Sequence, residues 1–259
     1  MADICAEIVI NRKIKQAFPT DCIIGEEDAT ELTDELFASI SKYIDVQDKE
    51  SITEALHSTP PNDQLSRYWA VDPIDGTKGF IRGDEYAICI ALVDGKSQKT
   101  SIAAMGCPNL EGGLVLIAVR GEGIYKAKLG DSFSTLEKVP NHSLSQSSRS
   151  AKITCAVESS HTKSSEIADL AQAMNNVVPL IKMDSQCKYA LLALNLAQKY
   201  YRRHASNESV CLSSPKYKEA IWDNAPGVLF VEEAGGQVTD FQGNHLSFPP
   251  SRHFYVVGG

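Results

Sequence analysis

The chain is organised around the stretch Trp69-Ala-Val-Asp72-Pro-Ile74-Asp75-Gly76-Thr77-Lys-Gly-Phe80, which joins an apolar strand to a turn. Two carboxylates, Asp72 and Asp75, stand three residues apart at the end of that strand. A Pro-containing turn reverses the backbone between them, so both side chains can face one pocket and the Ile74 carbonyl is exposed. Hard oxygen ligands at this density suit magnesium. The stretch therefore predicts a metal site.

Directly after these carboxylates comes a glycine turn that carries a hydroxyl. The backbone N–H groups of Gly76 and Thr77 would point at an anion, as in other Gly-containing turns that lead into helices. A metal site and a phosphoryl site are thus predicted side by side. The alternative is an ordinary turn, because Asp, Pro and Gly are common in turns of every kind.

Composition limits the class of protein. The chain has 259 residues, enough for one large domain or two closely packed halves. Seven cysteines without a C-x-x-C pair argue against a zinc cluster and a disulfide framework, so reduced and mostly buried thiols are expected. The formal charge of -8 disfavours a nucleic-acid polymer or an anionic membrane as partner. Without an apolar run near ~20 residues or a basic and apolar leader, a soluble, cytoplasmic protein is expected.

Hydrophobic periodicity predicts an α+β chain in two halves. The first half is expected to hold helices at 3–18 and 31–43, a polar surface excursion at 45–67, and strands at 22–24, 68–71, 86–93, 100–106 and 114–119. Asp94-Gly95 is a hairpin signal. The second half alternates strands at 153–157, 179–183, 199–202, 237–241 and 254–257 with helices at 165–174, 185–197 and 223–234. The Ser-rich segment 141–150 marks the boundary, so we expect a metal-binding half at 1–145 and a pocket-completing half at 146–259.

Several polar groups elsewhere are candidates for the same chemistry, each with a simpler alternative. Gly25-Glu26-Glu27-Asp28 is either a solvated acidic turn or a third carboxylate arm. Asp223 precedes a predicted helix and is a good N-cap whether or not it binds a metal. Ser185 and Lys188 begin another predicted helix and could converge on an anion, or serve as a cap with a solvent-facing lysine.

Three spaced motifs together resemble the signature of the lithium-sensitive, magnesium-dependent phosphatases that include inositol monophosphatase and fructose bisphosphatase. They are Gly25-Glu26-Glu27, Trp69-x-x-Asp72-Pro-Ile-Asp75-Gly-Thr77 and Trp222-Asp223-x-x-x-Gly227. Further segments are similar to the eukaryotic 3'(2'),5'-bisphosphate nucleotidases: Gly76-Thr-Lys-Gly-Phe80-Ile-Arg-Gly83, Met105-Gly-Cys-Pro-Asn109-Leu and Asp184-Ser-Gln-Cys-Lys-Tyr189. The resemblance runs from Ala2 to about Val257 and implies a layered αβαβα sandwich, with two mixed sheets and helices between and outside them.

The resemblance also implies roles for single residues. Two or three magnesium ions would be held by Glu26, Asp72, the Ile74 carbonyl, Asp75 and Asp223. Asp3 and Thr77 would activate the attacking water, and lithium would inhibit. The substrate would be bound by Gly76, Thr77, His161, Ser185, Lys188 and Arg202.

The activity implied is hydrolysis of the 3'-phosphate of adenosine 3',5'-bisphosphate (PAP) to AMP and phosphate by a monomeric enzyme, with the sulfated relative PAPS as a further substrate. One alternative is an inositol polyphosphate 1-phosphatase, which shares the metal site and differs in the polar pocket of the second half. Another is a catalytically silent nucleotide-binding homologue. Side-by-side turnover of adenosine 3',5'-bisphosphate and inositol 1,4-bisphosphate tests the first alternative, and the presence or absence of magnesium-dependent phosphate release tests the second.

Overall fold

A seven-stranded sheet forms the centre of the first half. The computed structural model describes residues 1–29, 32–56, 65–141, 151–157, 172, 180–200, 217–240 and 242–256. The strands lie in chain order, with β1 parallel to β2 and every other neighbouring pair antiparallel. They are β1 (Cys22–Gly25), β2 (Arg67–Asp75), β3 (Ala87–Asp94), β4 (Lys99–Cys107), β5 (Leu114–Val119), β6 (Gly123–Lys128) and β7 (Glu137–Lys138). The predicted hairpin at Asp94-Gly95 is confirmed, because it joins β3 to β4.

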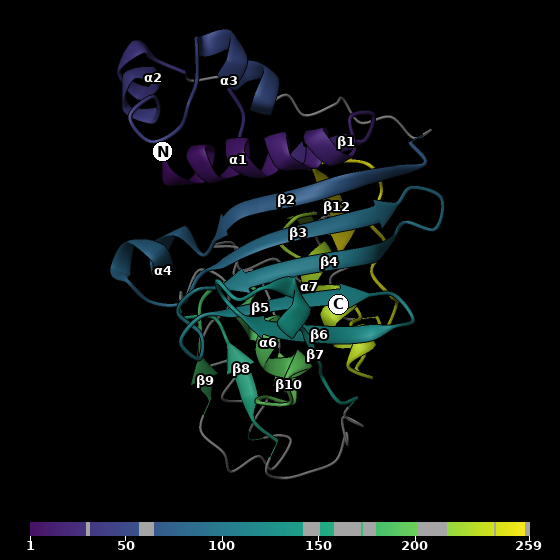
Figure 1. The fold of residues 1–259 in the computed structure, drawn as a ribbon. Helices are drawn as coiled ribbons and strands as arrows, with labels where there is room; N and C mark the ends of the chain where they lie inside the picture. Colours follow the sequence, from purple (N-terminus) through teal and green to yellow (C-terminus); the bar gives the residue numbers. More distant parts are fainter. Residues whose placement is uncertain are drawn as a thin grey trace.

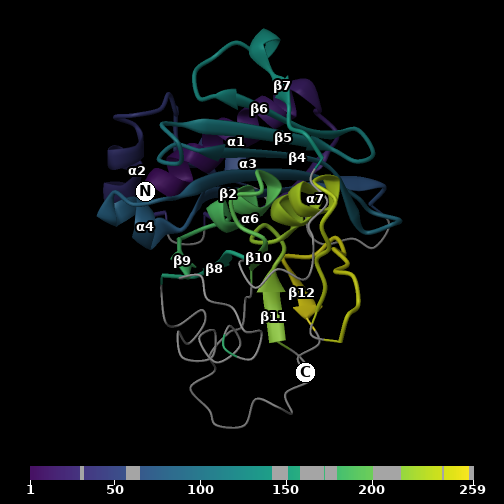
Figure 2. The same ribbon diagram turned by 90° about the horizontal axis from the view of Figure 1, so that it is seen from below.

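Different helices cover the two faces of this sheet because successive side chains of a strand point to opposite sides. In β2, Val71 packs with Ile14 of α1 (Ala2–Ala17). Its neighbour Ala70 packs with Val228 of α7 (Ala225–Glu233) on the other face. Figure 1 shows α1 lying along β2, and Figure 2 shows α6 (Cys187–Ala193) and α7 side by side on the opposite face.

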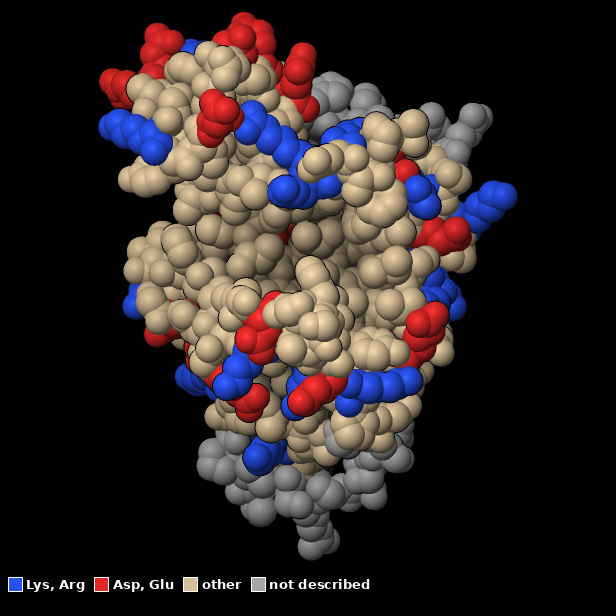
Figure 3. All heavy atoms as spheres, viewed as in Figure 1, with Lys and Arg blue, Asp and Glu red and all other residues tan. Residues whose placement is uncertain are grey.

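Two short helices complete the layer of α1: α2 (Asp34–Ile40) and α3 (Lys49–Leu56). The predicted surface excursion at 45–67 is therefore wrong at Lys49–Leu56, which form α3. The helix forms because Asp48 and Ser51 cap each other at its start, with the Ser51 N–H 2.8 Å from Asp48 Oδ1. Ile52 and Leu56 then pack with Ile8 of α1. Figure 3 shows acidic side chains over α2 and α3 and basic ones below them along α1.

Beyond α6 and α7 lies a second layer of strands. It contains β8 (Ile153–Cys155), β9 (Ile181–Lys182) and β10 (Lys199–Tyr200), parallel in the order β10-β8-β9. Its other part is the antiparallel pair of β11 (Tyr217–Ala220) and β12 (His253–Val256). The layers helix, sheet, helix and sheet confirm the predicted α+β sandwich. The helix predicted at 165–174 and the boundary at 145/146 fall almost wholly outside the described residues, so the division into two halves stays a prediction.

Some predicted elements have different limits, for local reasons. The helix predicted at 185–197 shrinks to α6 because Ser185 and Asn195, with φ of 60° and 57°, have left-handed backbone at its two ends. The strand predicted at 237–241 is wrong. Only Thr239 makes an isolated bridge, because the Asp240 carboxylate accepts the N–H groups of residues 242 and 244 and closes a turn. Strands β6, β7 and β11 were not predicted.

Two composition-based expectations can be compared with the structure. The six cysteines in the described ranges are all free thiols, and four of them are buried: Cys89, Cys107, Cys155 and Cys187. Across the same ranges, every helix is too short or too polar to span a bilayer.

Candidate functional site

Two carboxylates of β2 and a third from a distant part of the chain converge at the end of β2. Strand β2 pairs with β3 through Asp72 opposite Cys89 and Asp75 opposite Ala87, so β2 holds one extra residue between these pairs. Without this bulge two side chains three residues apart would point to opposite faces, and with it both reach one side. Asp223 comes from the turn before α7. One carboxylate oxygen from each of the three lies within 4.8 Å of the others.

Glu26 is the fourth carboxylate of this group, which we call the carboxylate cluster: Glu26, Asp72, Asp75 and Asp223. Parallel pairing places Glu26 beside β2, where its N–H donates to the Val71 carbonyl at 3.2 Å. Burial raises the pKa of Glu26 to about 7, although a hydrogen bond with Asp72 lowers that pKa in part. Burial and the charges of the other cluster members raise the pKa of Asp72 well above its usual range. The metal-free cluster therefore retains protons that isolated carboxylates would release.

The cluster fits a divalent cation. Asp72 is 1% exposed, and its Oδ1 atom is buried with no hydrogen-bond partner among the described residues. A buried carboxylate oxygen of this kind normally has a donor or a cation beside it. The three converging carboxylates, with Glu26 hydrogen-bonded to Asp72, offer the hard oxygen donors that magnesium prefers.

A hydroxyl lies next to the cluster. Thr77 begins α4 (Thr77–Arg82), and its Oγ1 is 3.3 Å from Asp3 Oδ1 and 3.2 Å from the Ile74 carbonyl oxygen. A hydroxyl has a single proton, so it donates to one of these acceptors at a time. Asp3 is in the first turn of α1, so that helix brings it to the end of β2. The structure therefore places the two predicted catalytic residues in contact.

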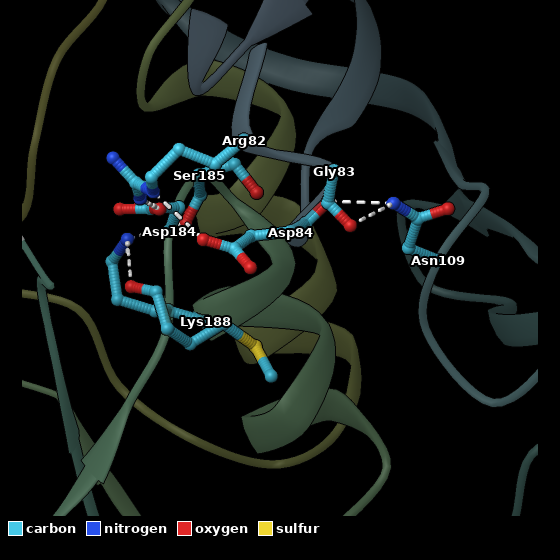
Figure 4. A network of polar contacts seen from close by, with 8 residues as sticks. Arg82, Gly83, Asp84, Asn109, Asp184, Ser185 and Lys188 are labelled. Atoms are coloured by element: carbon cyan, nitrogen blue, oxygen red, sulfur yellow. Dashed lines mark hydrogen bonds and ion pairs between the residues drawn. The ribbon is translucent and has the colours of Figure 1, made fainter. Parts of the chain in front are cut away.

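The predicted phosphate turn packs tightly against the second half of the chain. Gly76 has φ of 85°, and a Cβ there would lie 2.8 Å from the Ser185 Cβ. Only glycine meets both conditions without strain. The buried Asp184 forms an ion pair with Arg82 of α4, an exposed residue that also pairs with Asp84 at 2.7 Å (Figure 4). Ser185 is thus held directly over Gly76.

Lys188 does not face solvent, so the alternative of a solvent-facing lysine is wrong. It is 5% exposed, and its Nζ donates to the carbonyls of Ser185 and Met183 at 2.5 and 3.2 Å. Its ammonium also lies 5.5 Å from the centre of the Tyr200 ring. Lys188 therefore supports the segment that carries Ser185 (Figure 4). His161 and Arg202, the other predicted nucleotide contacts, lie outside the described residues.

Glu7 is a residue of this region that the sequence analysis missed. It is 0% exposed, and its Oε2 accepts the N–H of Glu27 at 2.9 Å. Burial raises its pKa to about 8. A Cβ on Gly25 would lie 1.9 Å from Glu7 Oε1, which is why the residue before Glu26 is glycine. The available signal was a glutamate three residues after Ile4 and seven before Ile14, a spacing that places it on the apolar face of the predicted helix.

Comparisons with known proteins agree on one family. The family model described as inositol monophosphatase family matches residues 1–257. A relative from Schizosaccharomyces pombe named 3'(2'),5'-bisphosphate nucleotidase is 32% identical over 97% of this chain and 76% of its own length. A second, 3'(2'),5'-bisphosphate nucleotidase 1 of Candida albicans, is 33% identical over 97% of this chain and 77% of its own.

A solved structure, the IMPase of Thermotoga maritima, superposes with a TM-score of 0.61 over 99% of this chain and 77% of its own, at 20% identity. At that identity the likeness concerns the fold alone, and it confirms the predicted sandwich.

Proposed function

The chain belongs to the inositol monophosphatase family, and on this basis we propose that it is a magnesium-dependent 3'(2'),5'-bisphosphate nucleotidase. It would hydrolyse the 3'-phosphate of adenosine 3',5'-bisphosphate with water, releasing AMP and inorganic phosphate, and would accept PAPS as well. The observation that carries the proposal is the meeting of Asp72, Asp75 and Asp223 within 4.8 Å, beside the Thr77 hydroxyl. The names of the relatives point to the bisphosphate nucleotide as substrate.

We assign the metal site to the carboxylate cluster and the Ile74 carbonyl, with two or three magnesium ions and inhibition by lithium. Asp72 Oδ1, which has no hydrogen-bond partner within the described part of the chain, supports this assignment, because a buried carboxylate oxygen requires a compensating charge or donor. Bound divalent cations would supply Lewis acidity, making water a stronger nucleophile and neutralising charge on the phosphoryl and leaving oxygens.

The protein's own groups would handle the proton and the substrate. With Thr77 Oγ1 within 3.3 Å of Asp3 Oδ1, the hydroxyl would pass its own proton to that carboxylate while its oxygen takes one from water, which leaves hydroxide as the nucleophile. The N–H groups of Gly76 and Thr77 would bind the phosphoryl group that is transferred. Because Ser185 packs on Gly76, a ligand at the turn also meets Ser185.

The second phosphate of the substrate would be selected by residues of the second half. We assign this role to Ser185 and Lys188, together with His161 and Arg202 outside the described residues. Lys188 supports the assignment through its ammonium, which donates to the Ser185 carbonyl and so places a positive charge next to Ser185. The halves 1–145 and 146–259 would then supply different functions, and we propose that one cytoplasmic monomer contains both.

The test is phosphate release from adenosine 3',5'-bisphosphate and from inositol 1,4-bisphosphate, with and without magnesium and with added lithium. We expect turnover of the nucleotide that requires magnesium and falls with lithium. Asp72→Asn is the inactive control, and Glu54→Gln on the exposed surface of α3 is the matched active one. Faster release from the inositol bisphosphate would identify an inositol polyphosphate phosphatase instead. Absence of release from either substrate would indicate a silent homologue.

A further inference from the structure

One buried amide side chain connects two arms of the carboxylate cluster. Gln186 is 1% exposed and precedes α6. Its backbone N–H donates to the Asp75 carboxylate. Its side-chain Nε2 donates to the Trp222 carbonyl at 2.8 Å, and its Oε1 accepts the Gly227 N–H at 3.1 Å. Gln186 thus contacts the end of β2 and both sides of the turn that carries Asp223.

The contact with Gly227 completes the start of α7. The first N–H groups of a helix have no partner within the helix. Here the Ala225 N–H donates to the Ile221 carbonyl, and Pro226 has no N–H. The side chain of the N-cap residue, Asn224, makes no capping bond within α7. Gln186, which lies just before α6, therefore provides for α7 the acceptor that an N-cap side chain usually supplies.

A second residue of the same region, in α6, also holds the residues that follow Asp223. Tyr189, one turn after Gln186, donates its hydroxyl to Asn224 Oδ1 at 3.0 Å. The Tyr189 ring also packs on Gly227, where a Cβ would lie 2.1 Å from its Cδ2. The backbone before and after Asp223 is therefore attached to the start of α6, which is itself attached to Asp75.

We propose that Gln186 is a positioning residue that sets the separation of the Asp75 and Asp223 carboxylates and thereby the affinity for divalent cations. This inference rests on the proposed metal site. Loss of the amide would leave the Trp222 carbonyl and the Gly227 N–H buried without their partner, and the turn would shift to find others. Because Asp223 lies in that turn, its carboxylate would move relative to Asp75.

The test measures binding of the metal alone. Mn²⁺ binding to the nucleotide-free protein is followed by electron paramagnetic resonance for wild type, Gln186→Met and Gln186→Asn. Met keeps the volume and the backbone N–H and removes both side-chain hydrogen bonds, so we expect the Kd for Mn²⁺ to rise about tenfold. Asn keeps the amide on a shorter stem that cannot reach both partners, so it should fall between Met and wild type. If Gln186→Met does not fold, the Kd of Gln186→Asn provides the measurement instead.

The matched control is Tyr68→Phe, which removes a buried hydroxyl that donates to the Phe248 carbonyl at 2.9 Å, away from the carboxylates. We expect this variant to lose stability in urea while its Kd for Mn²⁺ stays within about twofold of wild type. If the Gln186 variants are destabilised in the same way and bind Mn²⁺ like wild type, Gln186 is only structural and the inference is overturned.

The same data separate this inference from the proposed function. Wild-type protein that neither binds Mn²⁺ nor releases phosphate would overturn both. Wild type that does both, alongside Gln186 variants with unchanged Mn²⁺ affinity, would overturn the role of Gln186 alone.

Discussion

Replacing Glu7 with Gln should flatten the pH dependence of stability of the metal-free protein. Glu7 is fully buried beneath Gly25, and burial raises its pKa from 4.5 to about 8. Between these two values the folded protein keeps a proton that the unfolded chain has released. The free energy of unfolding therefore falls as pH rises through this window and levels off above the folded-state pKa. Gln does not titrate, so the variant lacks this contribution.

The magnitude follows from the width of the window. Each pH unit between the two pKa values changes the free energy of unfolding by about 1.4 kcal/mol for one group. From about pH 6 to about pH 8, most of which lies inside the window, the Glu7 contribution falls by about 2 kcal/mol. We expect the stability of Glu7→Gln relative to wild type to increase by that amount over the same range. The hydrogen bond to the Glu27 N–H survives, because Gln Oε1 is also an acceptor.

The assay is urea unfolding in the presence of a chelator, followed by tryptophan fluorescence, at about pH 6, pH 7 and pH 8. Comparing wild type with the variant at each pH cancels the titration of Glu26 and Asp72, whose raised pKa values act in the same direction. Glu54→Gln, on the exposed surface of α3, is the matched control and should show a constant difference from wild type. A constant difference for Glu7→Gln as well would refute the reasoning, because it would mean that Glu7 titrates alike in the folded and unfolded states.

Three further substitutions test other parts of the site. Asp72→Asn removes a carboxylate of the cluster, so magnesium-dependent phosphate release should fall below about a tenth of wild type. The far-ultraviolet circular dichroism should stay unchanged. Greater residual activity would contradict the role of Asp72. Lys188→Ala should raise KM for the bisphosphate nucleotide more than for a simple phosphate monoester, and equal losses on both would count against selection of the second phosphate. Gly227→Ala should lower the free energy of unfolding by about 1–3 kcal/mol, because the new methyl group would lie 2.1 Å from Tyr189 Cδ2; urea unfolding measures this, and an unchanged midpoint would show that the ring can move aside.

Local sequence was sufficient where short-range chemistry decides the structure. Strand composition predicted the segments that form β3, β4 and β5, and the turn at Asp94-Gly95 predicted the hairpin of β3 and β4, because such a hairpin depends on near neighbours. Helix α3 was missed although its capping pair, Asp48 and Ser51, is visible in the sequence. The segment around this pair is mostly polar, which favoured a surface excursion over a helix. Strand β11 pairs with β12 across more than thirty residues, and no local pattern specifies such a partner.

In the candidate site as well, some residues could be predicted from local sequence and others could not. The spacing of Asp72, Asp75 and Thr77 predicted a metal site beside a hydroxyl, and the third motif supplied Asp223 as a candidate. Glu7 and Gln186 were not singled out, because a buried glutamate and a buried amide have the same letters as exposed ones. Their partners, the Glu27 N–H and the Trp222 carbonyl, are backbone atoms that carry no sequence signal.

By itself the sequence determined which residues offer oxygen ligands suited to a divalent cation and N–H groups suited to an anion, since the type of ligand atom is a property of each side chain and its immediate turn. Tertiary structure alone decided that these atoms meet. A bulge in β2 turns Asp72 and Asp75 to one side, and Gln186 connects that end to the turn of Asp223. The physical reason is that a metal site depends on distances of a few ångströms between atoms far apart in the chain, and only packing of the layers determines such distances.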